Sequence, residues 1–242
     1  MTTNLNSQEQ TPAGGSSSHI RDSRAANTIA SLPADYLLPF ATCYVYSPKG
    51  ESDVSQRSRQ LCARVKSGST KWLRSYAATV HQEVVHGQAF GDFFADAALL
   101  VPIPDFRPSG QASFWAARRL ALALHETGLA EEVWTGLKRV SSVEKSSSAW
   151  MWERPTVQQH YQSFTVIPSS KAAKNILLID DVITKGRTLA AAAIRMQEAF
   201  PKADVRAFAL VRTMGFVLDV PRLFEPCQGV IHWNGEDAYR AP

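Results

Sequence analysis

One run of the sequence, from Asn175 to Ala193, constrains the fold of this chain more than any other. It reads NILLIDDVITKGRTLAAAA, a hydrophobic stretch followed by two acids, a Thr-x-Gly-x-Thr loop and an alanine-rich segment. The four apolar residues Ile176–Ile179 are typical of a parallel strand that is buried on both faces. Asp180 and Asp181 are then expected at the carboxyl end of this strand, the edge at which open α/β sheets bind ligands. The run therefore predicts an α/β fold with its functional edge at the two acids.

The loop that follows the acids has the composition of a phosphate-binding segment. Gly186 allows the backbone to approach a ligand closely. A helix that begins near Thr188 would add free N–H groups and the positive end of its dipole. Carboxylates beside a phosphate would repel it, so the two acids are expected to accept hydrogen bonds from vicinal hydroxyls or to lie near Mg²⁺. A ribose 5-phosphate meets both conditions.

Other kinds of site share parts of this pattern. A strand that ends in two acids also occurs in receiver domains and resembles phosphatase-type strands, but receivers do not continue into Thr-x-Gly-x-Thr. The P-loop signature Gly-x-x-x-x-Gly-Lys-Ser/Thr is absent from the chain. The remaining alternative is a plain helix cap and turn without a ligand.

The run closely resembles the signature of the type I phosphoribosyltransferases. The resemblance implies a central, mostly parallel sheet flanked by helices, with a mobile loop or hood over the site. It also implies that Asp180 and Asp181 hold the ribose hydroxyls of phosphoribosyl pyrophosphate (PRPP). The residues that would hold its 5-phosphate are Thr184, Lys185, Gly186, Arg187 and Thr188. Lys185 and Arg187 stand where many members have small residues, and both would place positive charge beside the phosphate.

A wider resemblance, over roughly residues 44–213, is to the ComF-type, competence-associated branch of that family. Val101–Pro104 is similar to its Val-Pro-x-Pro turn, Leu137–Arg139 to its Leu-x-Arg step, and His160–Phe164 to the segment before the signature strand. Members of the branch often begin with a cysteine-rich zinc module, which this sequence lacks. Its three cysteines are well separated and are expected to be buried thiols.

The resemblance also implies a site for pyrophosphate at the Val-Pro-x-Pro turn. Backbone N–H groups there would meet the pyrophosphate, and Mg²⁺, held mainly by PRPP itself, would bridge its oxygens. The residues assigned to this turn are Ile103, Pro104, Asp105 and Arg107. Thr184 stands where the 6-oxopurine enzymes carry an aspartate, so acceptor activation of the hypoxanthine or guanine type is not expected.

The chain of 242 residues is long enough for one α/β domain. Residues 1–31 lack an apolar run and are expected to form a disordered tail. We expect a phosphoribosyltransferase-like domain at 32–215 and a C-terminal extension at 216–242. No segment is apolar enough for a membrane span or a signal peptide, so a cytoplasmic protein without a membrane partner is expected.

Local patterns predict several elements around the signature. Apolar spacing and caps indicate helices that begin at Ser52 or Asp53 and near Trp72, and a third over Ala112–His125. Strands are expected at Thr42–Tyr46, Ala97–Val101 and Val205–Val211. The polar, serine-rich stretch Val133–Ser163 predicts a long mobile loop. Four basic residues of this stretch are candidates to close over the pyrophosphate, namely Lys138, Arg139, Lys145 and Arg154.

Basic residues also gather between Val54 and Arg74, where the sequence contains no acid. They are Arg57, Arg59, Arg64, Lys66, Lys71 and Arg74. A solvated face on two helices is the favoured interpretation of this basic stripe. A surface for nucleic acid or phosphorylated ligands is the alternative.

Two hypotheses for the function follow. In the first, the protein is an enzyme that transfers the phosphoribosyl group of PRPP to an unidentified nitrogenous acceptor and releases pyrophosphate, with Mg²⁺. In the second, it binds PRPP or a nucleotide without catalysis and has a ComF-like role in DNA uptake or regulation.

Overall fold

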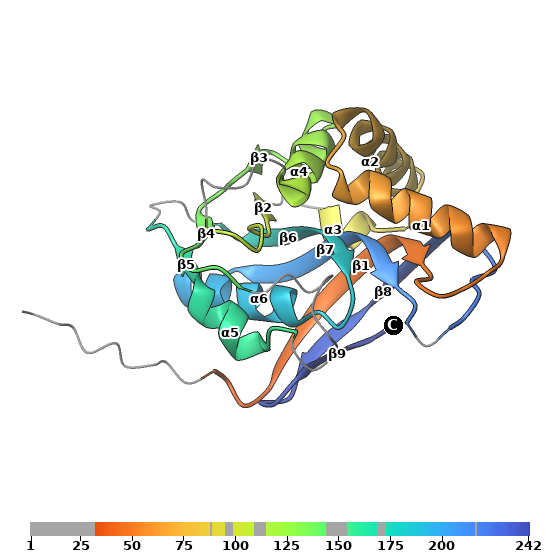
Figure 1. The fold of residues 1–242 in the computed structure, drawn as a ribbon. Coiled ribbons are helices and arrows are strands. Elements are labelled where there is room, and N and C mark those ends of the chain that lie inside the picture. The colour runs from red at the N-terminus through yellow and green to blue at the C-terminus, as the bar shows by residue number, and fades with distance from the viewer. Residues whose placement is uncertain are drawn as a thin grey trace, which may run out of the picture. The chain divides into compact units, whose positions relative to one another are not determined.

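The hydrophobic stretch of the signature run forms β6 (Asn175–Ile183), near the middle of a seven-stranded sheet in the computed structural model (Figure 1). The structure describes residues 32–87, 89–94, 99–108, 115–143, 154–168, 173–215 and 217–242. The tail 1–31, for which disorder was predicted, lies outside them.

The other strands of the sheet are β1 (Tyr36–Tyr46), β2 (Leu99–Pro102), β3 (Glu132–Val133), β7 (Asp204–Thr213), β8 (Phe224–Trp233) and β9 (Ala238–Ala241). Their order is β3-β2-β6-β7-β1-β8-β9. All neighbours from β3 to β1 are parallel, whereas β8 and β9 are added antiparallel. The prediction of a mostly parallel sheet is thereby confirmed.

Helices cover both faces of this sheet. Their bounds are α1 (Asp53–Lys66), α2 (Thr70–Val85), α3 (Gly91–Phe94), α4 (Ala116–Glu126), α5 (Val157–Ser163) and α6 (Arg187–Ala199). Figure 1 shows α1, α2 and α4 on one face and α5 and α6 on the other. A two-stranded ladder of β4 (Leu137–Arg139) and β5 (Phe164–Val166) packs beside α6.

The core has two layers because neighbouring residues of a strand point to opposite faces. Leu177 and Ile179 of β6 pack with α1, α2 and α4, while Ile176 and Leu178 pack on the side of α6. Four fully buried alanines, Ala190–Ala193, let α6 lie close to the sheet. The β6–α6–β7 unit is thus a strand–helix–strand crossover with both parallel strands adjacent, as the signature run predicts.

Several predicted elements are found, with different bounds. The α1 helix begins after Ser52, whose hydroxyl accepts from the N–H of Ser55, and Gly68 follows its end at a φ of 64°. The first strand is longer than expected and includes Pro39. Proline lacks an N–H, but this is tolerated here because Pro39 pairs only with β8, and pairing with β7 begins at the next residue, Phe40.

Two predictions about the organisation of the chain can be compared with the structure. Residues 216–242, the expected C-terminal extension, contribute β8 and β9 to the same sheet and the same compact unit as the rest of 32–242. The stretch Val133–Ser163 was expected to be a mobile loop, yet its described parts include β3, β4 and α5. Residues 144–153 lie outside the described residues, and with them Lys145 and the two tryptophans of the stretch.

None of the helices in the described part of the chain is long and apolar enough to cross a membrane.

Candidate functional site

The two acids lie within β6 rather than after it. Asp180 is in register with Ala209 of β7, and the pairing continues to Ile183, four residues beyond the expected end of the strand. Each carboxylate accepts the N–H of the next residue, at 2.8 Å from Asp180 to the nitrogen of Asp181 and 2.8 Å from Asp181 to that of Val182. These local hydrogen bonds fix both side chains at the carboxyl edge of the sheet.

The acid pair is electrostatically strained. Burial, followed by the charge of Asp181 and a hydrogen bond with its side chain, raises the pKa of Asp180 well above its usual value. The ammonium group of Lys66, in the last turn of α1, acts in the opposite direction. Two adjacent carboxyl groups of this kind do not readily carry two negative charges, and hydroxyl donors or a divalent cation would relieve the repulsion.

The loop Thr184–Thr188 leads directly into α6. Gly186 is the N-cap residue, with a φ of 90°, in the left-handed region that other residues rarely adopt. Gly186 has no side chain with which to cap this end of the helix, and the first-turn N–H groups of an α-helix have no partner within the helix. This geometry suits an anion such as a phosphate.

Both threonines of the loop contact polar side chains from other segments. The Thr184 and Thr213 hydroxyl oxygens are 3.2 Å apart, which links the loop to the end of β7. The Thr188 hydroxyl lies 3.2 Å from Nε2 of His160 in α5. The two hydroxyls expected to bind phosphate are therefore held in position by neighbours.

The basic residues of the loop do not stand free beside the helix end. The carboxylate of Asp237, in the turn between β8 and β9, accepts from Nζ of Lys185 at 3.0 Å. It also accepts from Nε and Nη2 of Arg187, at 2.5 and 2.7 Å. Burial alone would raise the pKa of Asp237, but the hydrogen bonds from Arg187 and Lys185 outweigh it and hold this pKa at about 2. The charges expected to face the phosphate are thus paired within the protein.

The turn after β2 lies next to the acid pair, because Pro102 is in register with Ile179. Its backbone N–H groups were expected to meet pyrophosphate, and not all of them are available for this. The N–H of Ile103 donates to the carbonyl of Ile179 at 2.8 Å, Pro104 has no N–H, and the N–H of Phe106 donates to the Asp105 carboxylate at 2.7 Å. The N–H groups of Asp105 and Arg107 have no hydrogen-bond partner among the described residues.

Arg107 was expected to add charge for the pyrophosphate. In the structure its Nη2 lies 3.3 Å from the Asp105 carboxylate, and 38% of its side chain is exposed. It can therefore still reach a ligand at this edge, although Asp105 offsets part of its charge.

Arg139 is not a mobile cation. It is 2% exposed, its Nε donates to the carbonyl of Asp105 at 2.6 Å, and its Nη1 donates to the hydroxyl of Ser163. The guanidinium carbon lies 4.3 Å from the centre of the Phe164 ring. Burial lowers the pKa of this guanidinium to about 10, while Asp105 and Asp180 act to raise it. Arg139 therefore ties the turn after β2 to the β4–β5 ladder.

The other candidates for closure are dispersed. Lys138 lies on β4 and is half-buried, and Arg154 contributes its carbonyl as an acceptor for Arg187 at 3.2 Å. Lys145 lies outside the described residues. The structure thus brings the acid pair, the loop and the turn together. Of the candidates for closure that it describes, it places Arg154 beside the loop, and Nε of that arginine is buried without a hydrogen-bond partner among the described residues.

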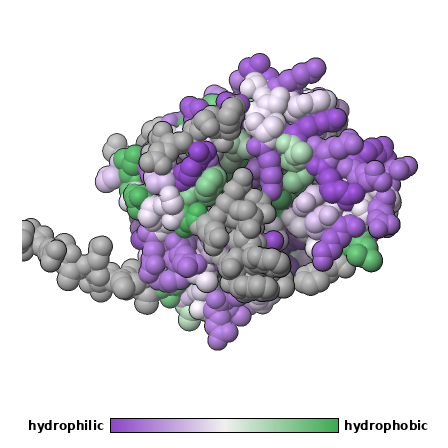
Figure 2. Space-filling model, viewed as in Figure 1, coloured by the Kyte–Doolittle hydropathy of each residue, from purple (hydrophilic) through white to green (hydrophobic). Residues whose placement is uncertain are grey.

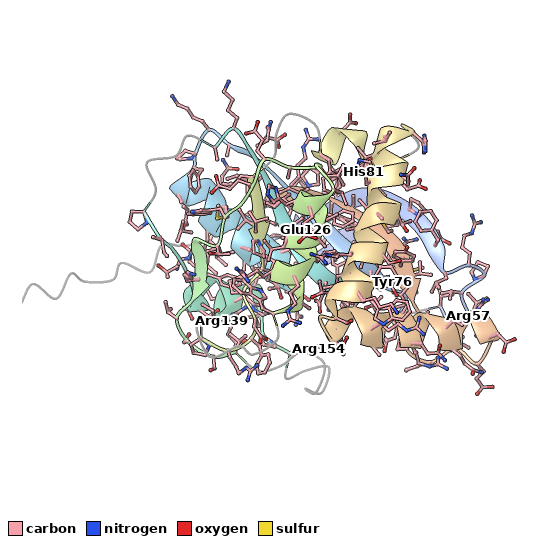
Figure 3. All side chains as sticks on the ribbon, turned by 90° about the horizontal axis from the view of Figure 1, so that it is seen from above. Arg57, Tyr76, His81, Glu126, Arg139 and Arg154 are labelled. Carbon is pink, nitrogen blue, oxygen red and sulfur yellow. The ribbon has the colours of Figure 1, made fainter. Side chains whose placement is uncertain are left out.

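The basic stripe has partners of its own. Arg59 donates to the carbonyls of Ser47 and Gly50, and Arg74 forms an ion pair with Glu126 at 2.7 Å. The guanidinium of Arg64 lies 4.2 Å from the centre of the Trp72 ring. The surface over α1 is mainly hydrophilic in Figure 2, and Figure 3 shows Arg57 at the opposite side of the molecule from Arg139. The solvated face therefore stays the favoured prediction for this stripe.

His160 is expected to make the stability of the fold depend on pH. Burial, followed by the charges of Arg139 and Arg187, lowers its pKa to about 3. An unfolded histidine has a pKa of about 6.5, so protons bind preferentially to the unfolded chain and stability is lost as the pH falls from about 6.5 towards 3. We expect this residue alone to lower the free energy of unfolding by about 2 kcal/mol between pH 7 and pH 5.

Urea unfolding of the wild type and of His160→Asn at both pH values measures this contribution. The variant should lose less stability than the wild type over this interval, because the other titrating groups are common to both proteins. An equal loss in the two proteins would show that His160 is not held neutral by the fold.

Sequence reasoning missed Asp237 altogether. Asn234-Gly235 between two strand-like runs is a hairpin signal, so the turn was detectable from the sequence. Its contact with a loop some fifty residues earlier had no local signal.

A scan of the sequence against protein-family models finds no match, and a search of curated proteins finds no similar sequence. No group of three or more metal-binding side chains occurs among the residues that the structure describes. The resemblance to the phosphoribosyltransferases therefore remains a prediction that the residues of the site carry.

Proposed function

We propose that this chain adopts a type I phosphoribosyltransferase-like fold and transfers the phosphoribosyl group of PRPP to a nitrogenous acceptor, with release of pyrophosphate. One observation carries the proposal. A single strand–helix unit places two carboxyl groups and a helix N-terminus, entered through a left-handed glycine, within the seven residues from Asp180 to Gly186. Vicinal hydroxyls next to a phosphate are the ligand chemistry that this combination suits.

The chain's own residues divide the work on such a ligand. Asp180 and Asp181 accept from the ribose hydroxyls, and these donors also relieve the repulsion within the acid pair. The loop N–H groups and threonine hydroxyls bind the 5-phosphate. The turn after β2 contributes the N–H of Asp105 and the guanidinium of Arg107 near the pyrophosphate. Fixing both ends of the ligand aligns its C1 for displacement, which is the main source of rate in reactions of this kind.

Mg²⁺ fits this donor set. Carboxylate oxygens and phosphate oxygens are the hard ligands that Mg²⁺ prefers, so Asp180 and Asp181 would share an ion that PRPP mainly holds. When bound, the ion would neutralise charge that develops on the leaving pyrophosphate.

The test is the release of pyrophosphate from PRPP and Mg²⁺ in the presence of panels of nucleobases and small amines. We expect release that depends on both the acceptor and Mg²⁺, and that disappears in the variant Asp180→Asn with Asp181→Asn. Asp204→Asn is the matched control, because this aspartate begins β7 at the opposite, amino edge of the sheet.

Combined with titration calorimetry, the pyrophosphate assay distinguishes phosphoribosyl transfer from PRPP binding alone. PRPP that binds in titration calorimetry but yields no pyrophosphate with any acceptor would leave a PRPP-binding protein without this activity. No binding of PRPP or ribose 5-phosphate would contradict the proposal as a whole.

A further inference from the structure

The turn between β8 and β9 is ordered by its own side chains. The side-chain oxygen of Asn234 accepts the N–H groups of Glu236 and Asp237, at 3.1 and 3.0 Å. The Asp237 carboxylate accepts the N–H of Ala238 at 2.8 Å. Hydrogen bonds within the turn therefore fix the orientation of the Asp237 side chain, independently of its contacts with other segments.

This fixed carboxylate holds the guanidinium of Arg187 from one side. Two nitrogens of Arg187 donate to the two oxygens of Asp237, the paired geometry that is strongest for an arginine and a carboxylate. A third nitrogen, Nη1, donates to the carbonyl of Arg154. Since the guanidinium is held by two segments and the Arg187 side chain is only 20% exposed, it is part of the framework of the loop and is not a free charge.

The hairpin also packs directly on the glycine of the loop. A Cβ on Gly186 would lie 2.8 to 2.9 Å from three carbons of the Ile231 side chain in β8. The loop thus contacts β8 at its centre and the β8–β9 turn at Lys185 and Arg187.

The charge of the loop follows from these pairs. Lys185 and Arg187 carry two positive charges, and Asp237 offsets one of them while it turns both side chains towards the hairpin. A phosphate at the N-terminus of α6 would then be bound by backbone N–H groups and by the hydroxyls of Thr184 and Thr188. Neutral donors fixed in advance bind an anion well only when the backbone that carries them is held still.

We propose that Asp237 is a positioning residue for the phosphate loop, whose carboxylate takes up Lys185 and Arg187 and so fixes the loop N–H groups and threonine hydroxyls for a phosphate. The inference rests on the proposed function for the identity of the ligand, but not for the order of the loop. It assigns the hairpin β8–β9 a part in the site.

The first measurement needs no ligand. Trypsin cleaves after lysine and arginine, so the rate of cleavage after Lys185 and Arg187, followed by mass spectrometry, reports whether the loop is ordered. We expect Asp237→Asn to raise this rate at least about tenfold, because local opening exposes the bond to the protease. Asp204→Asn, which removes a comparable exposed ion pair with Arg206, should leave the rate unchanged.

The second measurement uses PRPP with Mg²⁺ and, separately, ribose 5-phosphate in titration calorimetry. We expect Asp237→Asn to weaken both ligands about tenfold to a hundredfold, on the scale by which small misplacements of binding groups act. The affinity of the variant should also depend more steeply on salt, because Lys185 and Arg187 become available to the phosphate. A purely structural role in stability would not change the salt dependence.

The outcomes separate this inference from the proposed function. Unchanged trypsin cleavage, or equal or tighter PRPP binding in Asp237→Asn, would overturn the positioning role and show that Asp237 is neutral or competes with the ligand. Faster cleavage together with a wild type that binds neither ligand would retain the ordering role and reject the proposed function. If Asp237→Asn does not fold, Asn234→Ala, which loosens only the turn, should shift both measurements in the same direction.

Discussion

Replacing Asp180 and Asp181 together by asparagine is expected to abolish detectable PRPP binding and, at the same time, to raise the melting temperature. The two carboxylates would each lose charge-assisted hydrogen bonds to ribose hydroxyls, worth roughly 1.5–3 kcal/mol apiece. Together this corresponds to a loss of at least about a hundredfold in affinity. Titration calorimetry with PRPP and Mg²⁺ measures it directly.

The gain in stability follows from the raised pKa of Asp180. A carboxyl group whose pKa is higher in the folded than in the unfolded protein contributes stability that is fully present below its unfolded pKa and is lost as the pH rises through its folded pKa. At neutral pH the folded state is penalised, because burial and the charge of Asp181 oppose ionisation of Asp180. Asparagine removes this penalty and keeps an oxygen that can accept the N–H of the following residue.

Loss of PRPP binding together with a higher melting temperature would identify the acid pair as a ligand site. A ligand site that is strained without its ligand should lose binding and gain stability when its charges are removed. Asp204→Asn should change neither quantity beyond a few tenths of a kcal/mol, since its ion pair is exposed. Unchanged PRPP affinity in the double variant would remove the basis of the proposed site, and a lower melting temperature would show that the acid pair stabilises the fold.

Replacing Gly186 by alanine is expected to destabilise the fold through both backbone strain and overpacking. The φ of 90° costs an alanine about 1–2 kcal/mol. The new Cβ would also meet the side chain of Ile231 at 2.8 Å, and overpacking of this kind costs about 1–3 kcal/mol. A total of about 3 kcal/mol would lower the melting temperature by roughly 6–12 °C for a domain of this size.

Gly128 provides the matched control for the backbone cost. It has a φ of 84°, but a Cβ there would have no atom within 4 Å. Gly128→Ala should therefore cost only about 1 kcal/mol. It should leave PRPP binding unchanged, whereas Gly186→Ala should abolish it.

A double-mutant cycle with Ile231→Ala isolates the steric part. The double variant should be more stable than the sum of the single effects predicts, by about 1 kcal/mol or more, because the smaller residue 231 makes room for the new methyl group. Additive effects would mean that the loop and β8 do not contact each other as the structure has them.

The parallel core of the fold could be predicted because its signal is local. An uninterrupted apolar run such as Ile176–Ile179 is typical of a strand that is buried on both faces. A capping residue such as Ser52 marks the start of a helix directly. The strands β8 and β9 carried a weaker signal. Pro226 and Gly229 interrupt the pattern of β8, and its pairing partner β1 lies almost the whole described chain away.

Only the part of the candidate site that lies in one continuous stretch of sequence could be predicted. The run from Asp180 to Thr188 was found for this reason, but the roles of its charged residues depend on distant segments. Lys185 and Arg187 read as phosphate ligands until Asp237 is placed beside them. Arg139 reads as a solvent-exposed cation, and only the packing of the β4–β5 ladder shows that it is buried beneath a turn.

The position of β1 between β7 and β8 also determines when this protein can fold. The indole nitrogen of Trp233 donates to the carbonyl of Pro33, 200 residues earlier. During translation β1 must therefore wait, without either neighbour, until β7 and then β8 have left the ribosome. Proteins with such distant pairings fold slowly and expose unpaired strand edges in the meantime. The first strand to be synthesised is thus the one most in need of protection by a chaperone, and a chain that stops before residue 224 would leave it without the partner that also closes on the phosphate loop.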